Sequence, residues 1–472
     1  MRRTILTAAL TAGGLFALAA GPASAEETSV GLDDQTGVAV TIYNQNLALV
    51  RDSRSVMLTK GENDVAFIDV SAQIRPQTAL LKSSAGPLDV LEQNFDFDLL
   101  TPQKLLEKSV GRTVRVIRVD PDTGDETVQE ATVLSVADGG VVLKIGDRIE
   151  TQAPGRIVYS EVPPNLRSRP TLVTKLASGA EGKIPVELDY LTGGLGWAAD
   201  YVAELSPDEA TIELKGWVTL TNTSGTAYRN ARLQLVAGEV NQVAPAMEMQ
   251  MKTMAVPTAT AAAPMTEQAM FEYHLYTLDR PTTIAENQSK QVELLTGHGV
   301  PVRKEYRFDN VVSSFNARFG EAGRVNAAVR LIFENTEQAK LGMPLPKGVV
   351  RVYKADAAGN AIFVGEDAIE HTPKNESVKL VLGQAFDVTA RGRQTDFQVV
   401  ADNLYESAYE IELKNAKKEP VSVILRQYIP GDWKVLEESA KHEKVNSATA
   451  AWTVAIPAEG SAKLTYRVRV KY

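Results

Sequence analysis

The sequence has no cysteine among its 472 residues. This absence excludes disulfides, cysteine nucleophiles, zinc fingers and iron–sulfur clusters together. Histidine is almost as scarce, with four residues, and none of them forms an H-x-H or H-E-x-x-H motif. A G-x-S-x-G elbow, a P-loop and a dinucleotide-binding motif are also missing. The sequence therefore offers no local catalytic or cofactor-binding motif, although a triad assembled from distant positions stays open.

Long hydrophobic runs and clustered positive charge are lacking as well. After residue 25 no stretch approaches the roughly 18 apolar residues that a transmembrane helix needs. The formal net charge is −9, and lysine and arginine form no dense patch. A chain of this kind is not expected to bind nucleic acid or an anionic lipid surface. We expect a protein without a membrane span once its first residues are removed.

The first 25 residues have the features of a secretory signal peptide. Met1-Arg2-Arg3 is a short positive start, and residues 4–20 are small or apolar throughout. Gly21-Pro22 ends that segment, and Ala23-Ser24-Ala25 supplies the small side chains that signal peptidase requires. We therefore predict cleavage after Ala25 and a periplasmic or secreted protein. Because no cysteine follows the segment, we do not expect a lipoprotein.

What the chain has in abundance is alternation of β-branched and polar residues between glycine, asparagine and aspartate turns. This pattern predicts a mainly β fold built from several antiparallel, immunoglobulin-like sandwich modules. Residues 102–109 are one of the few helical stretches, with Thr101 as the expected N-cap and Pro102 at the first helical position. Five short strands between Thr113 and Tyr159 suggest a small, SH3-like barrel.

Turn signals and changes in composition divide the chain into modules. Residues 243–270 are rich in alanine, threonine, proline and methionine and show no sustained alternation, so we interpret them as a flexible linker. We predict a signal peptide (1–25), an N-terminal β module (26–100), a small barrel-like module (101–165), a β-sandwich (166–242), the linker (243–270), a continuation of the sandwich (271–405) and a C-terminal immunoglobulin-like module (406–472).

A weak internal repeat runs through the strands. The segments Trp217–Asn222, Val329–Asn335 and Tyr409–Asn415 are each an alternating strand that ends at an asparagine. A second strand or extended segment follows each of them within about twenty residues, a spacing that sandwich hairpins permit. Asparagine favours turns because its side chain bonds nearby backbone and tolerates left-handed conformations. The pattern indicates repeated sandwich units, or simply the frequency of asparagine in β-turns.

Several segments together resemble a known bacterial family. They are YLTGGLGWAADY at 190–201, GWVTLTN at 216–222, ARLQLVAG at 231–238, RPTTI at 280–284 and PGDW at 430–433. The chain resembles the exported members of the domain-of-unknown-function family numbered 4139, which also includes mucoidy inhibitor A-like proteins. The resemblance extends over nearly all of the predicted mature chain and implies an all-β protein. It implies no activity and no catalytic residues, and the coiled-coil region usual in mucoidy inhibitor A-like members is absent here.

Three aromatic residues in the family-like block are candidate ligand-binding residues. Trp197, Tyr201 and Trp217 lie near a glycine-rich turn, where their rings could stack on the apolar faces of a sugar. The alternative is core packing, which is the usual role of tryptophan on a sandwich strand.

Two further sites are weighed on residue type alone. Met247, Met249, Met251 and Met254 form M-x-M-x-M-x-x-M, and soft thioethers can bind copper(I), although methionines in a linker need no ligand. Asp96 and Asp98 alternate with phenylalanines and could act as a pair of catalytic acids, or simply face water.

The function predicted from these features is a non-enzymatic binding or scaffolding role in the bacterial envelope. The expected partner is another envelope protein or a glycan, and no cofactor is expected. Rigid sandwiches with interrupting loops are suited to presenting binding surfaces. Two alternatives stay open: a hydrolase that acts on envelope polysaccharide, and copper(I) binding through the methionine segment.

Overall fold

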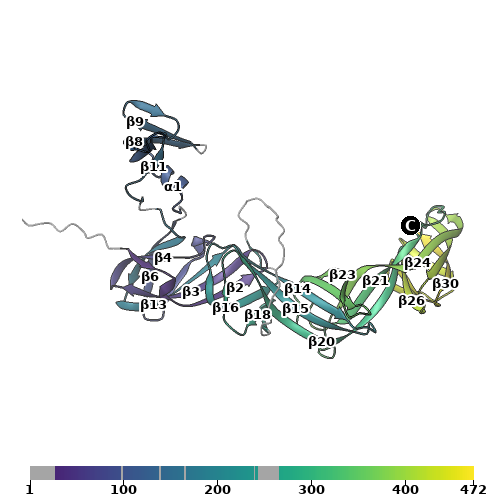
Figure 1. Cartoon of the computed structure of the whole chain (residues 1–472). Helices are drawn as coiled ribbons and strands as arrows, with labels where there is room; N and C mark the ends of the chain where they lie inside the picture. The colour runs from purple at the N-terminus through teal and green to yellow at the C-terminus, as the bar shows by residue number, and fades with distance from the viewer. Residues whose placement is uncertain (1–26, 97–98, 138–139, 164–165, 239, 243–264) are drawn as a thin grey trace, which may run out of the picture. The chain divides into compact units, whose positions relative to one another are not determined.

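The computed structural model describes residues 27–96, 99–137, 140–163, 166–238, 240–242 and 265–472 (Figure 1). In these residues regular structure is almost entirely β-strand, with one α-helix, α1 (Pro102–Glu107), and two short 3-10 helices, Leu32–Asp34 and Pro76–Thr78. The predicted mainly β fold is confirmed. None of the helices in the described ranges has the length and hydrophobicity of a membrane span.

The chain forms two compact units that alternate along the sequence. The first unit takes residues 1–36, 52–72 and 76–189, and the second takes residues 37–51, 73–75 and 190–472. Strands β2 (Gln35–Tyr43), β3 (Leu47–Leu58) and β13 (Gly182–Thr192) each continue from one unit into the other.

The first unit contains a four-stranded sheet with the order β1-β4-β12-β6. Its strands are β1 (Thr28–Val30), β4 (Gly61–Ile68), β12 (Thr171–Ser178) and β6 (Leu88–Asp96). In the same unit β5 (Leu80–Ser83) pairs with residues 186–189 of β13 in antiparallel register. Strand β1 pairs with β4 in parallel, so residues distant along the chain close the edge of this sheet.

A buried ion pair fastens β1 to this unit. The side chain of Arg54 is fully buried and donates to Asp52 at 2.7 Å. The other side of its guanidinium donates to the carbonyl oxygens of Val30 at 2.7 Å and Ile68 at 2.6 Å. Gln35 donates to the second carboxylate oxygen of Asp52 at 2.8 Å. A buried charge is tolerated only when it is paired and hydrogen-bonded in this way.

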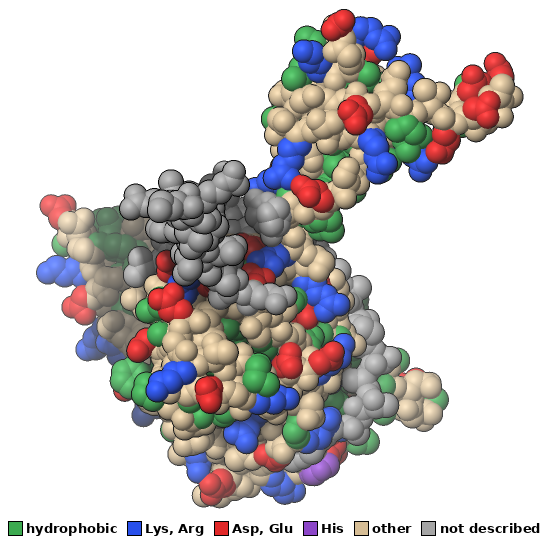
Figure 2. Space-filling view, turned by 90° about the vertical axis from the view of Figure 1, so that its left-hand side faces the viewer, with side chains coloured by type: hydrophobic (Ala, Val, Ile, Leu, Met, Phe, Trp, Pro, Cys, Tyr) green, Lys and Arg blue, Asp and Glu red, His purple; other side chains and the backbone are tan. Residues whose placement is uncertain are grey.

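The small module predicted at 101–165 contains the five expected strands. Its sheet has the order β10-β9-β8-β7-β11. The strands are β7 (Thr113–Val119), β8 (Glu126–Ala137), β9 (Gly140–Ile145), β10 (Arg148–Glu150) and β11 (Arg156–Val158). The sheet is not closed into a barrel, because β10 and β11 are its two edges and no pairing joins them in the described residues. Thr101 caps α1 as predicted, since its hydroxyl accepts the Lys104 N–H at 3.2 Å. Figure 2 shows one face of the whole chain, on which basic and acidic side chains are interspersed.

The second unit contains two sheets. In one, the order within this unit is β17-β18-β16-β2, and β19 also pairs with β16. Its additional strands are β16 (Tyr228–Ala237), β17 (Met265–Met270), β18 (Tyr273–Leu278) and β19 (Thr282–Ile284). Residues 265–270 were assigned to the linker from sequence, yet they form β17. They form a strand because backbone pairing with β18 requires no alternation of side chains.

The other sheet of the second unit has thirteen strands, ten of them in the continuous order β23-β22-β14-β15-β20-β21-β24-β25-β30-β27. The three remaining strands continue from β20 by the pairs β20–β26, β26–β29 and β29–β28. The bounds are β14 (Leu195–Leu205), β15 (Thr211–Asn222), β20 (Gln288–Asp309), β21 (Val325–Glu334), β22 (Gly348–Ala355), β23 (Ala361–Ile369), β24 (Ser377–Ala401), β25 (Leu404–Asn415), β26 (Val421–Tyr428), β27 (Asp432–Glu438), β28 (Glu443–Asn446), β29 (Thr449–Ile456) and β30 (Gly460–Lys471).

Two long strands join consecutive sandwich units in this sheet. Strand β20 has 22 residues and pairs with β15 along its first part and with β21 along its second part. Strand β24 has 25 residues and pairs first with β21 and then with β25. Each junction is therefore made of continuous hydrogen-bonded strand, and Figure 1 shows β14, β15 and β20 running side by side.

The three asparagines that end the repeated sequence pattern make similar contacts in the structure. Asn222, Asn335 and Asn415 are all buried. Asn222 ends β15, Asn335 directly follows β21, and Asn415 ends β25. The side-chain amide of each donates to carbonyl groups in two separate loops. The acceptors are Thr226 and Ala285 for Asn222, Met343 and Pro373 for Asn335, and Glu419 and Pro457 for Asn415.

The core of the C-terminal sandwich is rich in aromatic residues. Trp452 stacks on Tyr466 with ring centroids 4.7 Å apart, and Tyr466 lies 5.3 Å from Tyr409. Buried residues of β20, β21 and β24 join this cluster, among them Phe308 and Val388. The core of the C-terminal sandwich thus draws on strands that precede residue 406.

Candidate functional site

The described part of the second unit contains two neighbouring hollows along one ribbon of chain. The ribbon is formed by residues 344–349, which lead into β22, and residues 368–373, which follow β23, and an isolated bridge joins Leu345 to Thr372. We call the hollow at the β22 end the Trp197 hollow. It has a volume of about 280 Å³ and is lined by Asn44, Trp197, Ala198, Lys347, Gly348, Val349, Ala368, Ile369 and Glu370.

A close approach of two strands shapes the floor of the Trp197 hollow. Strand β22 pairs with β14 in parallel, with Gly348 opposite Ala199. A Cβ atom at position 348 would lie 2.1 Å from the carbonyl oxygen of Ala199. Only glycine therefore fits at the start of β22. This pairing places the backbone of residues 347–349 beside the Trp197 ring.

Trp197 lines this hollow and has an unused hydrogen-bond donor. The residue is 8% exposed, and its indole packs edge-on against Tyr276 with centroids 6.5 Å apart. The buried Nε1–H has no hydrogen-bond partner within the described residues. Buried indole N–H groups usually find an acceptor, because leaving one unpaired costs about 1–3 kcal/mol. An acceptor oxygen of a bound molecule would satisfy it.

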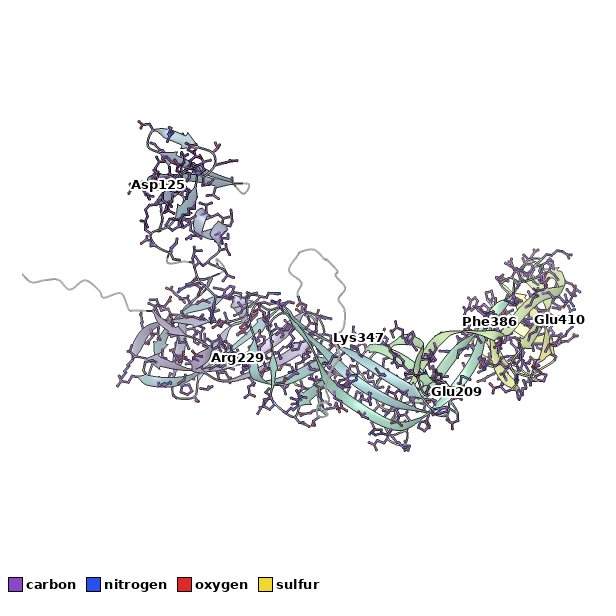
Figure 3. The ribbon with its side chains drawn as sticks, in the orientation of Figure 1. Asp125, Glu209, Arg229, Lys347, Phe386 and Glu410 are labelled. Atoms are coloured by element: carbon purple, nitrogen blue, oxygen red, sulfur yellow. The ribbon has the colours of Figure 1, made fainter. Side chains whose placement is uncertain are left out.

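The hollow also carries unpaired charge at its rim. Lys347 and Glu370 are both exposed, and neither forms an ion pair in the part of the chain that the structure describes. The backbone N–H of Lys347 donates to His371 Nδ1 at 3.2 Å, which fixes the backbone at this point. Figure 3 labels Lys347. The rim thus offers one cation and one anion above a largely apolar wall.

The second hollow follows directly along the ribbon, and we call it the Tyr276 hollow. It has a volume of about 210 Å³ and is lined by Ala237, Gly238, Glu272, His274, Tyr276, Pro344, Leu345, His371, Thr372 and Pro373. Tyr276 donates to the carbonyl of Pro344 at 3.0 Å, and burial raises the pKa of its hydroxyl. His274 Nδ1 lies 2.9 Å from Glu267, so β17 and β18 hold this imidazole in place.

The structure separates the three aromatic residues predicted as a ligand site. Tyr201 is fully buried, and its hydroxyl donates to the Pro346 carbonyl at 2.8 Å, so it positions the ribbon from beneath. Burial raises the pKa of Tyr201 well above its usual value. Trp217 is half-buried and pairs with Asp200, which places it on the opposite face of the sheet from Trp197. Of the three, Trp197 alone lines one of these two hollows.

Comparison with known families identifies the region that carries this site. The family model described as "Domain of unknown function (DUF4139)" matches residues 186–472. The chain belongs to this family. The DUF4139 region contains every lining residue of both hollows except Asn44. No curated protein matches the chain. The connection to mucoidy inhibitor A-like proteins stays a prediction.

The other sequence candidates lie elsewhere. Met247, Met249, Met251 and Met254, and the predicted cleavage site at Ala25, are outside the described residues, as is Asp98. Asp96 accepts from Arg167 at 2.8 Å, so an ion pair occupies this carboxylate. Within the described ranges no group of three or more His, Asp or Glu side chains is arranged to hold a metal ion.

Sequence analysis missed the polar residues of the Trp197 hollow. Nothing in the local sequence distinguishes Lys347 and Glu370 from other charged residues. They lie beside Trp197 only because β22 pairs with β14 in parallel. The local signal was the segment Pro344-Leu345-Pro346-Lys347-Gly348, whose two prolines mark a fixed turn before a strand.

Proposed function

We propose that the protein is an exported, non-enzymatic binding protein of the bacterial envelope that holds a glycan in the Trp197 and Tyr276 hollows. The observation that carries this proposal is that Trp197, whose buried indole N–H is unpaired in the described residues, lines an open hollow. Sugar hydroxyls would accept from this N–H and bond to Lys347 and Glu370. The apolar faces of the ring would contact the aliphatic wall.

The sizes of the hollows favour a chain of small units over one large molecule. Ligand pockets for drug-sized molecules usually have volumes of about 300–1,000 Å³. The two hollows have volumes of about 280 and 210 Å³, and consecutive residues, Glu370 and His371, line them. Each hollow suits one ring of a linear oligosaccharide.

Cleavage after Ala25 would leave the described contacts at the start of the chain intact. Glu27 forms two hydrogen bonds with Arg167, each of 2.8 Å, and Arg167 also bonds to Asp96. Strand β1 begins at Thr28 and pairs with β4. A chain cleaved after Ala25 would retain every one of these contacts.

Titration of envelope oligosaccharides into purified protein tests the proposed binding. The change is Trp197→Phe, which keeps an aromatic ring and removes the N–H. One hydrogen bond contributes about 0.5–1.5 kcal/mol, so we expect the affinity to fall about threefold to tenfold by calorimetry. Trp217→Phe, on the opposite face of the sheet, is the matched control and should bind like the wild type. Equal affinities in all three proteins would refute the role of Trp197.

The hydrolase alternative has one structural feature in its favour. A hollow of about 410 Å³ in the C-terminal sandwich is lined by three glutamates, Glu410, Glu437 and Glu438, together with Arg467 and others. Burial raises the pKa of Glu410, but the hydrogen bond and charge of Arg393 and the charge of Lys463 more than offset this and lower it overall. A lowered pKa suits a structural carboxylate better than a proton donor, which glycosidases require.

A further inference from the structure

Four arginines gather on one face of the sheet in the C-terminal part of the second unit. Strand β20 pairs with β21 on one side and with β26 on the other (Figure 1). Arg330 of β21 lies opposite Glu305, and Arg426 of β26 lies opposite Asp309. Side chains opposite one another, and alternate side chains of one strand, project from the same face. We call this surface the arginine face. It comprises Arg303, Glu305, Arg307, Asp309, Arg330 and Arg426.

The arginine face is the outer face of its sheet. Tyr306 and Phe308, the intervening residues of β20, are buried in the C-terminal core. The side chain of Arg307 is 19% exposed and that of Arg330 is 15% exposed. These two guanidinium groups therefore lie low on the surface, where electrostatic interactions are stronger than in open water.

The positive charge of this face is only partly neutralised. Arg307 pairs with Asp309 at 2.8 Å, and Arg303 pairs with Glu305 at 3.0 Å. Arg330 has only a longer approach of 3.7 Å to that same Glu305. Within the described ranges no carboxylate pairs with Arg426. With four arginines and two acids, the face keeps two uncompensated positive charges in a chain whose net charge is −9.

Hydrogen-bond donors on the same face are unused. The Nε atoms of Arg330 and Arg426 are both buried, and neither has a hydrogen-bond partner within the residues that the structure describes. Burial lowers the pKa of Arg330, and the charges of Arg307 and Arg426 add to this effect. Leaving a buried charged donor unpaired is among the more expensive features of a fold. Two such donors beside like charges indicate a missing negative partner.

We propose that the arginine face binds a doubly charged oxyanion of the phosphate type. The planar fork of arginine matches phosphate oxygens in a bidentate manner. A phosphate group carries a charge of about −1.5 to −2 at pH 7 and three acceptor oxygens, which matches the excess charge and the unused donors. A single carboxylate would leave one positive charge uncompensated. This site is independent of the proposed glycan binding, because none of its residues lines either hollow.

Calorimetric titration with small anions tests the proposal on the full mature chain. The probes are inorganic phosphate, glycerol 3-phosphate and acetate, in a chloride buffer of constant ionic strength. We expect saturable binding of at least one phosphate compound, and acetate binding at least tenfold weaker. Arg426→Gln should weaken phosphate binding at least tenfold. Arg229→Gln is the matched control, because Arg229 is an exposed arginine of β16 (Figure 3) outside the arginine face.

A second variant guards against a folding defect. Arg426→Lys keeps the positive charge but loses the planar guanidinium group. We expect this variant to unfold at the wild-type temperature, yet to bind phosphate several-fold more weakly than wild type. Phosphate affinity that is equal in wild type, Arg426→Lys and Arg426→Gln would overturn the proposal. So would the lack of saturable phosphate binding to wild type, or acetate binding as tight as phosphate. If wild type binds phosphate compounds, comparing its affinities for inorganic phosphate and glycerol 3-phosphate shows whether the site prefers the free ion or a phosphate ester.

Discussion

Three buried asparagines contribute more to this fold than their place in turns suggests. The sequence places Asn222, Asn335 and Asn415 at strand ends, because asparagine favours turns. The structure shows that each also joins a second loop that is far away in the chain, such as residues 284–285 for Asn222. The local half of this role could be predicted from sequence. The second half could not, because it depends on tertiary pairing.

Asn222→Asp tests the contribution of these asparagines. The substitution keeps the shape of the side chain but replaces its amide NH2 group, which donates to the Thr226 and Ala285 carbonyls, with a carboxylate oxygen, which cannot donate. A buried charge without a partner is expected to lower the free energy of unfolding by about 3 kcal/mol. Asn230→Asp, at an exposed position of β16, is the control and should change it by less than about 0.5 kcal/mol. Denaturant titration measures both. Similar losses in the two variants would contradict the account.

Trp197 shows the same limit of sequence analysis at a candidate site. By pattern alone, core packing is the usual role of a tryptophan on a sandwich strand, and ligand binding is the alternative. In the structure the Trp197 ring is buried and its N–H is unpaired in the described residues, while the residue also lines a hollow. The decisive contacts come from residues more than a hundred positions later, which no local pattern reveals.

At the scale of elements, local signals were reliable and pairing was not. Helix α1 and its Thr101 cap were predicted because proline and threonine act through neighbouring residues. The five strands of the small module were also predicted, but not the open edges of their sheet. Closure depends on whether β10 and β11 meet, and this is a non-local property.

The turn between β14 and β15 is held by a charged clamp. Glu209 lies in this turn (Figure 3) and bonds to Lys304 of β20 and, at 2.6 Å, to Lys354 of β22. Burial raises the pKa of Glu209, but the hydrogen bonds and charges of the two lysines more than offset this and lower it overall. The clamp therefore ties the turn between β14 and β15 to two other strands of the sheet, β20 and β22, through a single carboxylate.

The clamp predicts a pH dependence of stability. Because the folded-state pKa of Glu209 lies below its unfolded value, the clamp stabilises the fold above that unfolded value, and this contribution is lost as pH falls through the folded-state pKa. Glu209→Gln should unfold at a lower temperature than wild type at pH 7, and the difference should shrink below about pH 4. Glu204→Gln, at an exposed position of β14, should match wild type throughout. A difference for Glu209→Gln that does not change with pH would contradict the clamp.

At the scale of the whole molecule, consecutive sandwiches in the described residues of the second unit share strands. Strands β20 and β24 each serve two consecutive sandwiches. The sequence indicated the repeat through its asparagines, but not the sharing of strands. In β20 the turn-type residues Gly297, Gly299 and Pro301 lie where the partner changes from β15 to β21, yet the strand continues through them, so the local sequence does not reveal that the strand is shared.

Export predicts a defined N-terminus for the mature chain. We expect the protein recovered from the periplasm or medium to begin at Glu26, measured by mass spectrometry of the intact protein. Replacing Ala25 with a bulky residue should leave the precursor uncleaved, because signal peptidase requires small residues there. A cytoplasmic protein that still begins at Met1 would contradict this prediction.

The central claim is that the Trp197 and Tyr276 hollows bind an envelope glycan, and crosslinking in living cells tests it most directly. A photoactivatable residue at Glu370, on the rim of the Trp197 hollow, would be compared with one at Trp217, on the opposite face of the sheet. After irradiation, mass spectrometry would identify what is attached. The account predicts a saccharide adduct from position 370 and none from position 217. No saccharide adduct at either position, or equal adducts at both, would contradict it.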